Sequence, residues 1–431
     1  MTAELARPVA TLPEMTAEAA SRARHLERLR ALDHRLQLAA ELPAPSSRTS
    51  ARSRTSAEQL ADALGGRVVG GEAGRLVITD AELDFPLDPT PLARLPFPVD
   101  PSRPLLLLDT ETTGLGTAAG TVAFLVGLGR WRGERLVLRQ LWLPDHADEP
   151  ALLSALQDEL PPDAWLVTYN GRSFDWPLLV TRYRLHRRAP PILAGHLDLL
   201  PVARQLWRHR LPDARLASVE AGVAGLRRDD DLPGALVPER YFAMLRGAPP
   251  HVLRPVAEHN RADVVAMAHL LRILSDRLAD PRARRAEHPG DLAGLGRAHR
   301  RHGQLAEAAS CLEDALEADD PRPGPPLDRE ALALERARLL GRLGRRHEAR
   351  AALDELATRG GRTAVLAGIA LAVQLEHRER DLSGALEAAR RAADLQRRRR
   401  SLGLFLPEAE RDLPHRLARL ERRLRRASPA A

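Results

Sequence analysis

Two carboxylates stand one residue apart at the end of an apolar run. The stretch LLLLDTETTG places Asp109 and Glu111 directly after four leucines, and Thr112, Thr113 and Gly114 then turn the chain. Side chains at i and i+2 of a strand share one face, so both carboxylates can point at the same object. Two anions held about 6 to 7 Å apart in a partly buried place repel each other unless a cation lies between them. The pattern predicts a site for a hard divalent cation with oxygen ligands.

The Asp-x-Glu spacing alone is weak evidence, because Asp80-Ala81-Glu82 has the same spacing and we assign it no role. The context of Asp109 is different. An apolar strand delivers it to a strand end, and in open α/β sheets ligands collect at the carboxyl ends of strands.

Further polar residues stand where they can join this pair. In YNGRSFDWPLL, Asn170 ends a predicted strand and Asp175 opens a helix, although an isolated Asp in that place commonly only caps its helix. In EHNRADVVAMAHLL, His259 and Asp263 are four residues apart and share one helix face, although such a pair is usually a surface pair.

The elements that must position these residues can be read from periodicity and turn residues. We expect strands at 104–109, 121–130, 135–143, 164–169 and 192–197, and helices at 149–160, 174–186, 199–207 and 251–278. Three consecutive strands followed by alternating helices and strands predict a mixed sheet covered by helices.

The combined order of motifs is more specific than any one of them. Asp-x-Glu after an apolar strand, Asn-x4-Asp opening a helix and His-x3-Asp on a final helix resembles the DEDD, or DnaQ-like, superfamily of 3′-to-5′ exonucleases. This superfamily has the ribonuclease-H-like fold, and the resemblance covers about residues 100 to 280. The stretches at 196–207 and 218–242, with the helices that follow, look like the bacterial YprB-like branch. We therefore expect an α/β fold: a ribonuclease-H-like mixed sheet with flanking helices, followed by an all-α tetratricopeptide-like helical repeat region.

The resemblance implies a role for each acid. Asp109, Glu111, Asp175 and Asp263 would bind two Mg²⁺ or Mn²⁺ ions that clamp the scissile phosphate. His259 would be the general base. Family members that use histidine usually have it five residues before the final Asp, and here the spacing is four. One residue rotates a helical side chain by about 100°, so His259 either approaches the water differently or only orients it.

Several other residues have less certain places. Thr112 and Asn170 are expected to contact the substrate. Asp198, after a predicted strand, is either an acid behind the metal ligands or a helix cap. We expect Asp229, Asp230 and Asp231 to lie in a solvated loop, and Arg172, Arg182 and Arg187 to contact phosphates or lie on a solvated face.

Composition limits the classes of function. The net charge is +7 and the chain contains no lysine, so the basic excess is entirely arginine. The excess either favours a polyanion such as nucleic acid or reflects a coding bias. The absence of lysine excludes a P-loop lysine or a Schiff base, and Cys311, the only cysteine, excludes an internal disulfide. No apolar run is long enough to span a membrane and no signal peptide is visible, so we expect a cytoplasmic protein.

The chain divides by composition. Glu-Ala pairs that begin at Glu307, Glu348 and Glu387 recur in similar helical stretches at intervals of 41 and 39 residues, similar to tetratricopeptide repeats. Ala/Arg/Leu-rich helices can also produce such a pattern by accident. We expect a disordered or helical basic tail and linker (1–60), a lead-in segment packing on the nuclease domain (61–100), the exonuclease-type domain (101–280), the repeats (285–395) and a basic C-terminal tail (396–431).

Two functions are compatible with these features. The first is a metal-dependent 3′-to-5′ exonuclease acting on single-stranded DNA or RNA ends by a two-metal mechanism. The alternative is a non-catalytic nucleic-acid-binding scaffold whose helical repeats recruit a protein partner. Mutually repelling acids favour catalysis, since a binder has no need of them.

Overall fold

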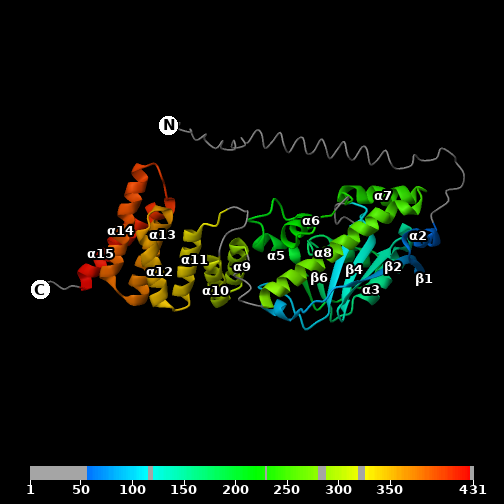
Figure 1. Ribbon diagram of the computed structural model, residues 1–431, viewed down its shortest axis with the longest axis horizontal. Coiled ribbons are helices and arrows are strands. Elements are labelled where there is room, and N and C mark those ends of the chain that lie inside the picture. Colours follow the sequence, from blue (N-terminus) through cyan, green and yellow to red (C-terminus); the bar gives the residue numbers. More distant parts are fainter. Residues whose placement is uncertain (1–55, 115–119, 229–230, 280–287, 319–325, 428–431) are drawn as a thin grey trace, which may run out of the picture.

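A computed structural model describes residues 56–114, 120–228, 231–279, 288–318 and 326–427 (Figure 1). Its N-terminal part is built on one seven-stranded sheet of order β1-β2-β5-β4-β3-β6-β7. The strands are β1 (Arg67–Gly71), β2 (Gly74–Asp84), β3 (Leu105–Thr112), β4 (Ala123–Arg132), β5 (Arg135–Trp142), β6 (Trp165–Thr168) and β7 (Gly195–Asp198). The expected mixed sheet is confirmed, because β3, β6 and β7 pair in parallel and the other neighbours pair antiparallel.

The lead-in segment contains a β-hairpin, formed by β1 and β2. Strand β2 continues beyond the hairpin and pairs with β5 from Val77 to Asp84. The lead-in segment therefore extends the central sheet itself. The expected N-terminal tail lies largely outside the described residues, except that α2 (Ala57–Leu64) starts at a Ser56 cap and packs on this hairpin.

Helices cover both faces of the sheet. The α-helices after α2 in this part are α3 (Glu149–Glu159), α4 (Asp175–Leu185), α5 (Leu199–Leu206), α6 (Leu216–Val219), α7 (Val237–Leu245) and α8 (Arg254–Ala279). Short turns of 3-10 or π-helix connect them: η1 (Thr90–Arg94), η2 (His146–Asp148), η3 (Glu220–Ala224), η4 (Gly234–Leu236) and η5 (Pro250–Leu253). Figure 1 shows α8 as the long helix that crosses the sheet diagonally.

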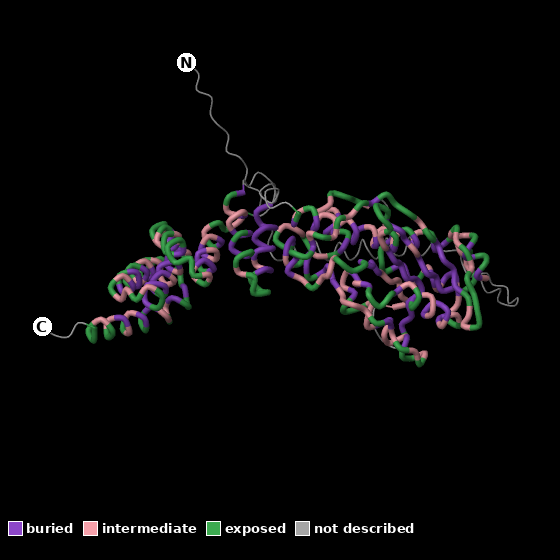
Figure 2. Tube along the Cα trace, turned by 90° about the horizontal axis from the view of Figure 1, so that it is seen from below, coloured by how far each residue is buried: buried purple, intermediate pink, exposed green. Residues whose placement is uncertain are grey.

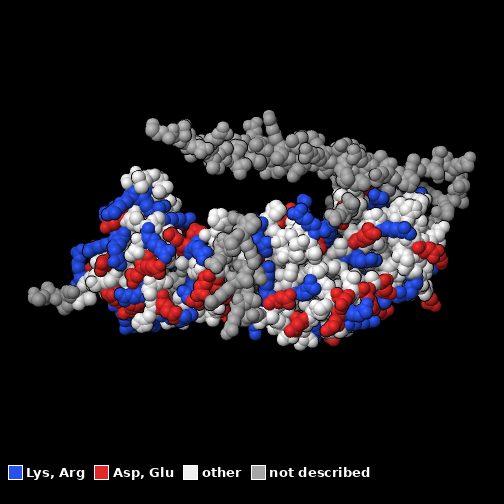
Figure 3. All heavy atoms as spheres, in the orientation of Figure 1, with Lys and Arg blue, Asp and Glu red and all other residues white. Residues whose placement is uncertain are grey.

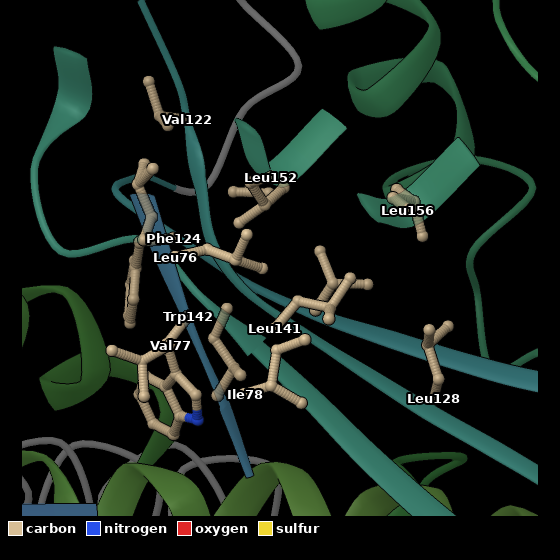
Figure 4. Close-up of a cluster of buried hydrophobic side chains, with 14 of the residues drawn as sticks. Leu76, Val77, Ile78, Val122, Phe124, Leu128, Leu141, Trp142, Leu152 and Leu156 are labelled. Atoms are coloured by element: carbon tan, nitrogen blue, oxygen red, sulfur yellow. The ribbon is translucent and has the colours of Figure 1, made fainter. Parts of the chain in front are cut away.

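The four leucines before Asp109 belong to two different cores. Leu106 and Leu108 pack with α3 and α4 in one apolar cluster, whereas Leu105 and Leu107 pack with α5 and α8 in another. Side chains alternate between the faces of a strand, so the two clusters lie on opposite sides of the sheet. Figure 4 shows part of the first cluster around Trp142, Phe124 and Leu141. Burial on both faces makes β3 a rigid support for the residues that follow it.

Helix α8 lies unusually close to the sheet because glycines face it. A Cβ atom added to Gly127 would lie 2.1 Å from Asn260 Oδ1, and one added to Gly129 would lie 2.7 Å from Val264 Cγ1. Both glycines are on β4, beside β3. The sheet thus leaves room for a buried polar side chain of α8 directly above β4.

The C-terminal part is all helical and extends from one end of the sheet part (Figure 1). It contains α9 (Pro289–Arg301), α10 (Leu305–Glu317), α11 (Arg329–Arg342), α12 (Arg346–Thr358), α13 (Gly361–Gln374), η7 (Leu375–Glu379), α14 (Leu382–Ser401) and α15 (Pro407–Ala427). Neighbouring helices pack in sequence order, and buried residues occur in both parts of the molecule (Figure 2). The expected fold class, a mixed α/β domain followed by an all-α region, is confirmed.

The three Glu-Ala stretches lie on α10, α12 and α14, each after the turn that follows a partner helix. The turns contain a left-handed residue: Gly303, Gly344 and Arg380 with φ of 78°, 80° and 60°. Beyond α14, the basic residues near the C-terminus lie on α15, where Leu413 and Leu420 are buried. No helix among the described residues is long and apolar enough to cross a bilayer.

The close approach of α8 can be tested at Gly127. We expect Gly127→Ala to lower the free energy of unfolding by about 1 to 3 kcal/mol, because the added methyl group collides with the buried Asn260 amide. Gly71→Ala, in β1 where an added Cβ meets nothing within 4 Å, is the control and should change it little. Urea unfolding measures both. Equal stability of the two variants would contradict this packing.

Candidate functional site

Three elements bring the predicted acids to the carboxyl end of β3. Asp109 and Glu111 are on β3 itself, Asp175 is the first residue of α4, and Asp263 lies on α8, which packs on β3. Asp175 Oδ1 accepts hydrogen bonds from the Thr110 backbone N–H at 3.1 Å and from the Thr110 hydroxyl at 2.5 Å. These bonds tie the start of α4 to β3 between the two carboxylates of the Asp-x-Glu pair.

Asp109 is held by a buried polar chain that crosses the sheet. Asn260 of α8 donates from Nδ2 to Asp109 Oδ2 at 2.8 Å, and it accepts at Oδ1 from Gln140 Nε2 at 2.9 Å. Gln140 in turn accepts from the Thr79 hydroxyl at 3.1 Å. The register aligns Asp109 with Gly127 and Gly127 with Gln140, so Asn260 bridges two strands above the glycine between them.

The pKa values of three of the acids, Asp109, Glu111 and Asp175, are raised. Burial, and then the negative charges of Asp263, Glu111 and Asp175, raise the pKa of Asp109 well above its usual value. Burial and the charges of Asp263 and Asp175 do the same for Glu111. Burial raises the pKa of Asp175 to about 6 against the opposing hydrogen bonds from Thr110. Mutual effects of this kind require the four carboxylates to be close together in one partly enclosed place.

A basic side chain, that of Arg228, reaches this cluster. Arg228 Nη1 lies 2.6 Å from Asp263 Oδ1 and 3.2 Å from Asp231 Oδ2, and its Nε lies 2.7 Å from Glu220 Oε2. Although burial disfavours the charged guanidinium, Asp263 and Glu220 raise the pKa of Arg228, so it stays positive. Asp109, Glu111 and Asp175 form no ion pair with any described residue.

His259 also has a defined partner. Its Nδ1 donates to Asp231 Oδ1 at 2.6 Å, and its Nε2 lies 3.9 Å from Asp263 Oδ2. A carboxylate can only accept, so in the neutral imidazole this bond places the proton on Nδ1 and the lone pair on Nε2, which lies toward Asp263. The prediction that Asp231 lies in a solvated loop is therefore wrong. Asp229 and Asp230 lie outside the described residues.

Two other predicted residues, Asp198 and Arg182, have defined partners. Asp198 caps α5 through Leu200 N at 3.0 Å and also accepts from the backbone N–H groups of Asn170 at 2.7 Å and Arg172 at 3.2 Å. It thus fixes the loop after β6. Arg182 pairs with the buried Glu149, which leaves it unsuited to phosphate contact.

The two predicted substrate residues flank the acids. Thr112 ends β3 and donates its hydroxyl to the Gly114 carbonyl at 2.6 Å. Asn170 is the second residue of the loop after β6 and has a left-handed φ of 68°, a conformation that Asn tolerates better than most residues.

Three residues around the acids were not found from the sequence: Asn260, Arg228 and Asp231. Asn260 had a detectable signal, because it adjoins His259 and because Gly127 and Gly129 mark a strand that something approaches closely. Arg228 and Asp231 had none, since arginine and aspartate are abundant in the stretch that contains them.

The donor set fits a hard divalent metal. All four groups are carboxylates, the ligand type that Mg²⁺ and Mn²⁺ prefer, and three of them have no cation among the described residues to balance their charge. A bound divalent cation would reverse the repulsion that raises their pKa values. The residues present are therefore compatible with the ions that the sequence predicts.

A second group of possible metal ligands lies at the junction of the two parts. His209 Nε2 is 3.3 Å from His288 Nδ1 and 3.4 Å from Asp291 Oδ1. Asp291 already receives two hydrogen bonds of 2.9 Å from Arg210, and Arg277 lies 3.3 Å away. Its charge is balanced by these arginines. We interpret the group as a polar contact that joins α9 to the end of α5.

Comparison with known proteins agrees with this geometry. Residues 106–275 match the model of the RNase_H superfamily, and this range contains all four acids. The protein "Uncharacterized protein YprB" of Bacillus subtilis (strain 168) is 32% identical over 323 residues, which are 74% of this chain and 75% of the relative. The chain belongs to the YprB family. Members of the RNase H superfamily are generally hydrolytic nucleases that use divalent metals, so the fold of this YprB-family chain indicates a nuclease and a nucleic acid substrate.

The charge repulsion in this YprB-family chain predicts a stability effect. A folded-state pKa above the unfolded value means that the folded state binds more protons, so stability without metal falls as pH rises from about 4 through the raised pKa. We expect Asp109→Asn to increase the free energy of unfolding in EDTA at pH 7.5 by roughly 1 to 3 kcal/mol. Saturating Mg²⁺ or Mn²⁺, at about 100 times the Kd, should stabilise wild type by about 2.7 kcal/mol and the variant much less.

Asp80→Asn provides the matched control for this measurement. Asp80 forms ion pairs with Arg67 and Arg139 on the other face of the sheet. Removing its charge should lower the free energy of unfolding and leave the stabilisation by bound metal unchanged. Denaturant unfolding at pH 5 and pH 7.5, with EDTA or metal, measures all three proteins. An Asp109→Asn protein that is less stable in EDTA and gains as much from metal as wild type would contradict the repulsion.

Proposed function

We propose that this chain is a metal-dependent 3′-to-5′ exonuclease that hydrolyses phosphodiester bonds at single-stranded ends of DNA or RNA. The observation that supports this most directly is the convergence of four carboxylates from β3, α4 and α8, three of them without a balancing cation among the described residues. Such a cluster destabilises the protein unless it serves a cation.

The proposed ligands are Asp109, Glu111, Asp175 and Asp263. Two bound Mg²⁺ or Mn²⁺ ions would supply charge stabilisation for the scissile phosphate and lower the pKa of an attacking water. The chain's own contribution is to fix the ligands: Asn260 orients Asp109, Thr110 orients Asp175, and Arg228 orients Asp263. Positioning of this kind is most of what phosphoryl transfer requires of the protein.

His259 is the proposed proton acceptor. Its Nε2 lone pair faces the acid cluster, and Asp231 holds the other ring nitrogen. When Nε2 takes a proton from water, the negative charge of Asp231 stabilises the imidazolium that forms. The proposed contacts to the terminal nucleotide are Thr112, at the end of β3, and Asn170, near the start of the loop after β6.

The chain offers a matched pair of variants to test hydrolysis. Glu111→Gln removes a proposed ligand and should reduce release of nucleotides from single strands by at least about 10³-fold, because charge on the scissile phosphate is no longer balanced. Glu82→Gln removes the same charge from the second Asp-x-Glu, where Glu82 pairs with Arg135 at an exposed place, and should retain activity.

The assay uses strands labelled at the 5′ end, with Mg²⁺ or Mn²⁺. Stepwise shortening is expected for a free 3′ end, and none for a circular strand. If wild type and Glu111→Gln are equally inactive but both bind the strand, the chain is instead a nucleic-acid-binding scaffold.

The histidine assignment has its own test. We expect His259→Ala to lower kcat by about 10² to 10⁴-fold with little change in KM, since general bases contribute that much. Asp231→Asn should lower kcat by roughly tenfold, because the amide can still accept the Nδ1 proton but no longer stabilises the imidazolium. Single-turnover kinetics on a short single strand measure both. A change confined to KM in both variants would refute the assignment.

A further inference from the structure

A cleft lined by arginines lies beside the four acids. It has a volume of about 800 Å³ and lies between the loop after β6, helix α5 and the loop that leads to α6. Its walls include Tyr169, Asn170, Arg204, Arg208 and Arg215. This size is within the range of clefts that bind ligands.

The sheet register places the cleft next to Asp109. Strands β3 and β6 run parallel and pair as far as Leu107 opposite Val167. Asp109 is two residues beyond this pair on β3, and Tyr169 is the first residue after the end of β6. Neighbouring strands are about 4.8 Å apart. Leu107 and Val167 both belong to the core on the α5 and α8 side, so the side chains of Asp109 and Tyr169 lie on that same face.

The wall beyond Tyr169 is held in place. The Tyr169 hydroxyl donates to the Ala214 carbonyl at 2.6 Å, which fixes the loop before α6. Asp198 fixes the other side through the backbone N–H groups of Asn170 and Arg172. The cleft therefore has a defined shape next to the acids.

The charge of the cleft is positive and available. Arg204 and Arg208 are exposed and form no ion pair with any described residue. Arg215 is 86% exposed and lies 3.7 Å from Asp213, the acidic residue on the cleft wall. Figure 3 shows basic and acidic atoms interspersed over the helical part, and basic atoms with a few acidic ones around α5 and α6.

We propose that this cleft binds the phosphodiester backbone of the single strand on the 5′ side of the scissile bond, through Arg204, Arg208 and Arg215. Three separated arginines match several successive phosphates, whereas a single released nucleotide carries one. The inference rests on the proposed function for the direction of the strand, but binding in the cleft does not depend on hydrolysis. Guanidinium groups bind phosphate oxygens well and carry little sequence preference.

Binding without hydrolysis is the first test. In EDTA, the double variant Arg204→Ala/Arg208→Ala should bind a fluorescent single-stranded 12-mer about tenfold more weakly than wild type at 0.1 M salt. The slope of log K against log salt should fall by about 1.4, since each phosphate contact on a single strand contributes about 0.7. Arg204→Lys/Arg208→Lys keeps both charges and should keep the slope.

The control removes the same charge elsewhere. Arg132 and Arg184 are also exposed and without an ion pair among the described residues, but they lie at the far end of β4 and on α4. Arg132→Ala/Arg184→Ala should leave affinity and salt slope near wild type. An equal loss in both double variants would show a general charge effect and overturn the cleft assignment.

Kinetics separate the cleft from the catalytic proposal. On the 12-mer, Arg204→Ala/Arg208→Ala should raise KM about tenfold, and on the p-nitrophenyl ester of thymidine 5′-phosphate its activity should equal wild type. A KM on the 12-mer equal to that of wild type would overturn the inference and leave the nuclease proposal unaffected.

An inactive wild type whose binding still depends on Arg204 and Arg208 would refute hydrolysis and support the cleft. An acidic peptide that binds the cleft more tightly than the 12-mer would overturn it in favour of a protein ligand.

Discussion

The arrangement of the acids depends on one buried contact, the hydrogen bond from Asn260 to Asp109 above Gly127. The bond connects α8 to β3, and it forms only because a strand without a side chain at position 127 lets the helix come close. The side-chain amide of Gln140 donates hydrogen bonds to Asn260 Oδ1 and to the Ala257 carbonyl. A shift of α8 along the sheet would therefore leave a buried amide without a hydrogen-bond partner. Because Asp263 and His259 lie on the same helix, this contact also sets their distance from β3.

The same arrangement concentrates negative charge, and the rest of the fold must offset the resulting repulsion. The raised pKa values of Asp109, Glu111 and Asp175 mean that folding works against their ionisation. Two apolar cores on opposite faces of the sheet provide the opposing stabilisation, and they meet at β3, where the charge is greatest. Cation binding and folding are then linked, since a cation removes the repulsion that the fold opposes.

Local patterns in the sequence were enough to predict most of the sheet, and the resemblance to the DEDD superfamily singled out the four acids. The run LLLLDTET specifies a strand and its carboxylates within eight residues, and helix α8 is recognisable from periodicity alone. The sequence did not reveal the roles of Asn260, Arg228 and Asp231, because strand register and loop conformation determine which residues they contact. The pairing of Asp231 with His259 spans 28 residues, and Asp231 ends a run of two arginines and three aspartates that carries no periodic signal. The exonuclease type and the repeat family of α9–α15 stay predictions.

The four-residue spacing of His259 and Asp263 gains a physical meaning from Asp231. Residues four apart on α8 lie one above the other, which accounts for the 3.9 Å between His259 Nε2 and Asp263 Oδ2. An imidazole at that place could rotate about its χ angles and present either nitrogen to the acids. The bond from Nδ1 to Asp231 removes this freedom and leaves one basic atom facing the cluster. A loop carboxylate thus supplies the orientation that helix spacing alone does not impose.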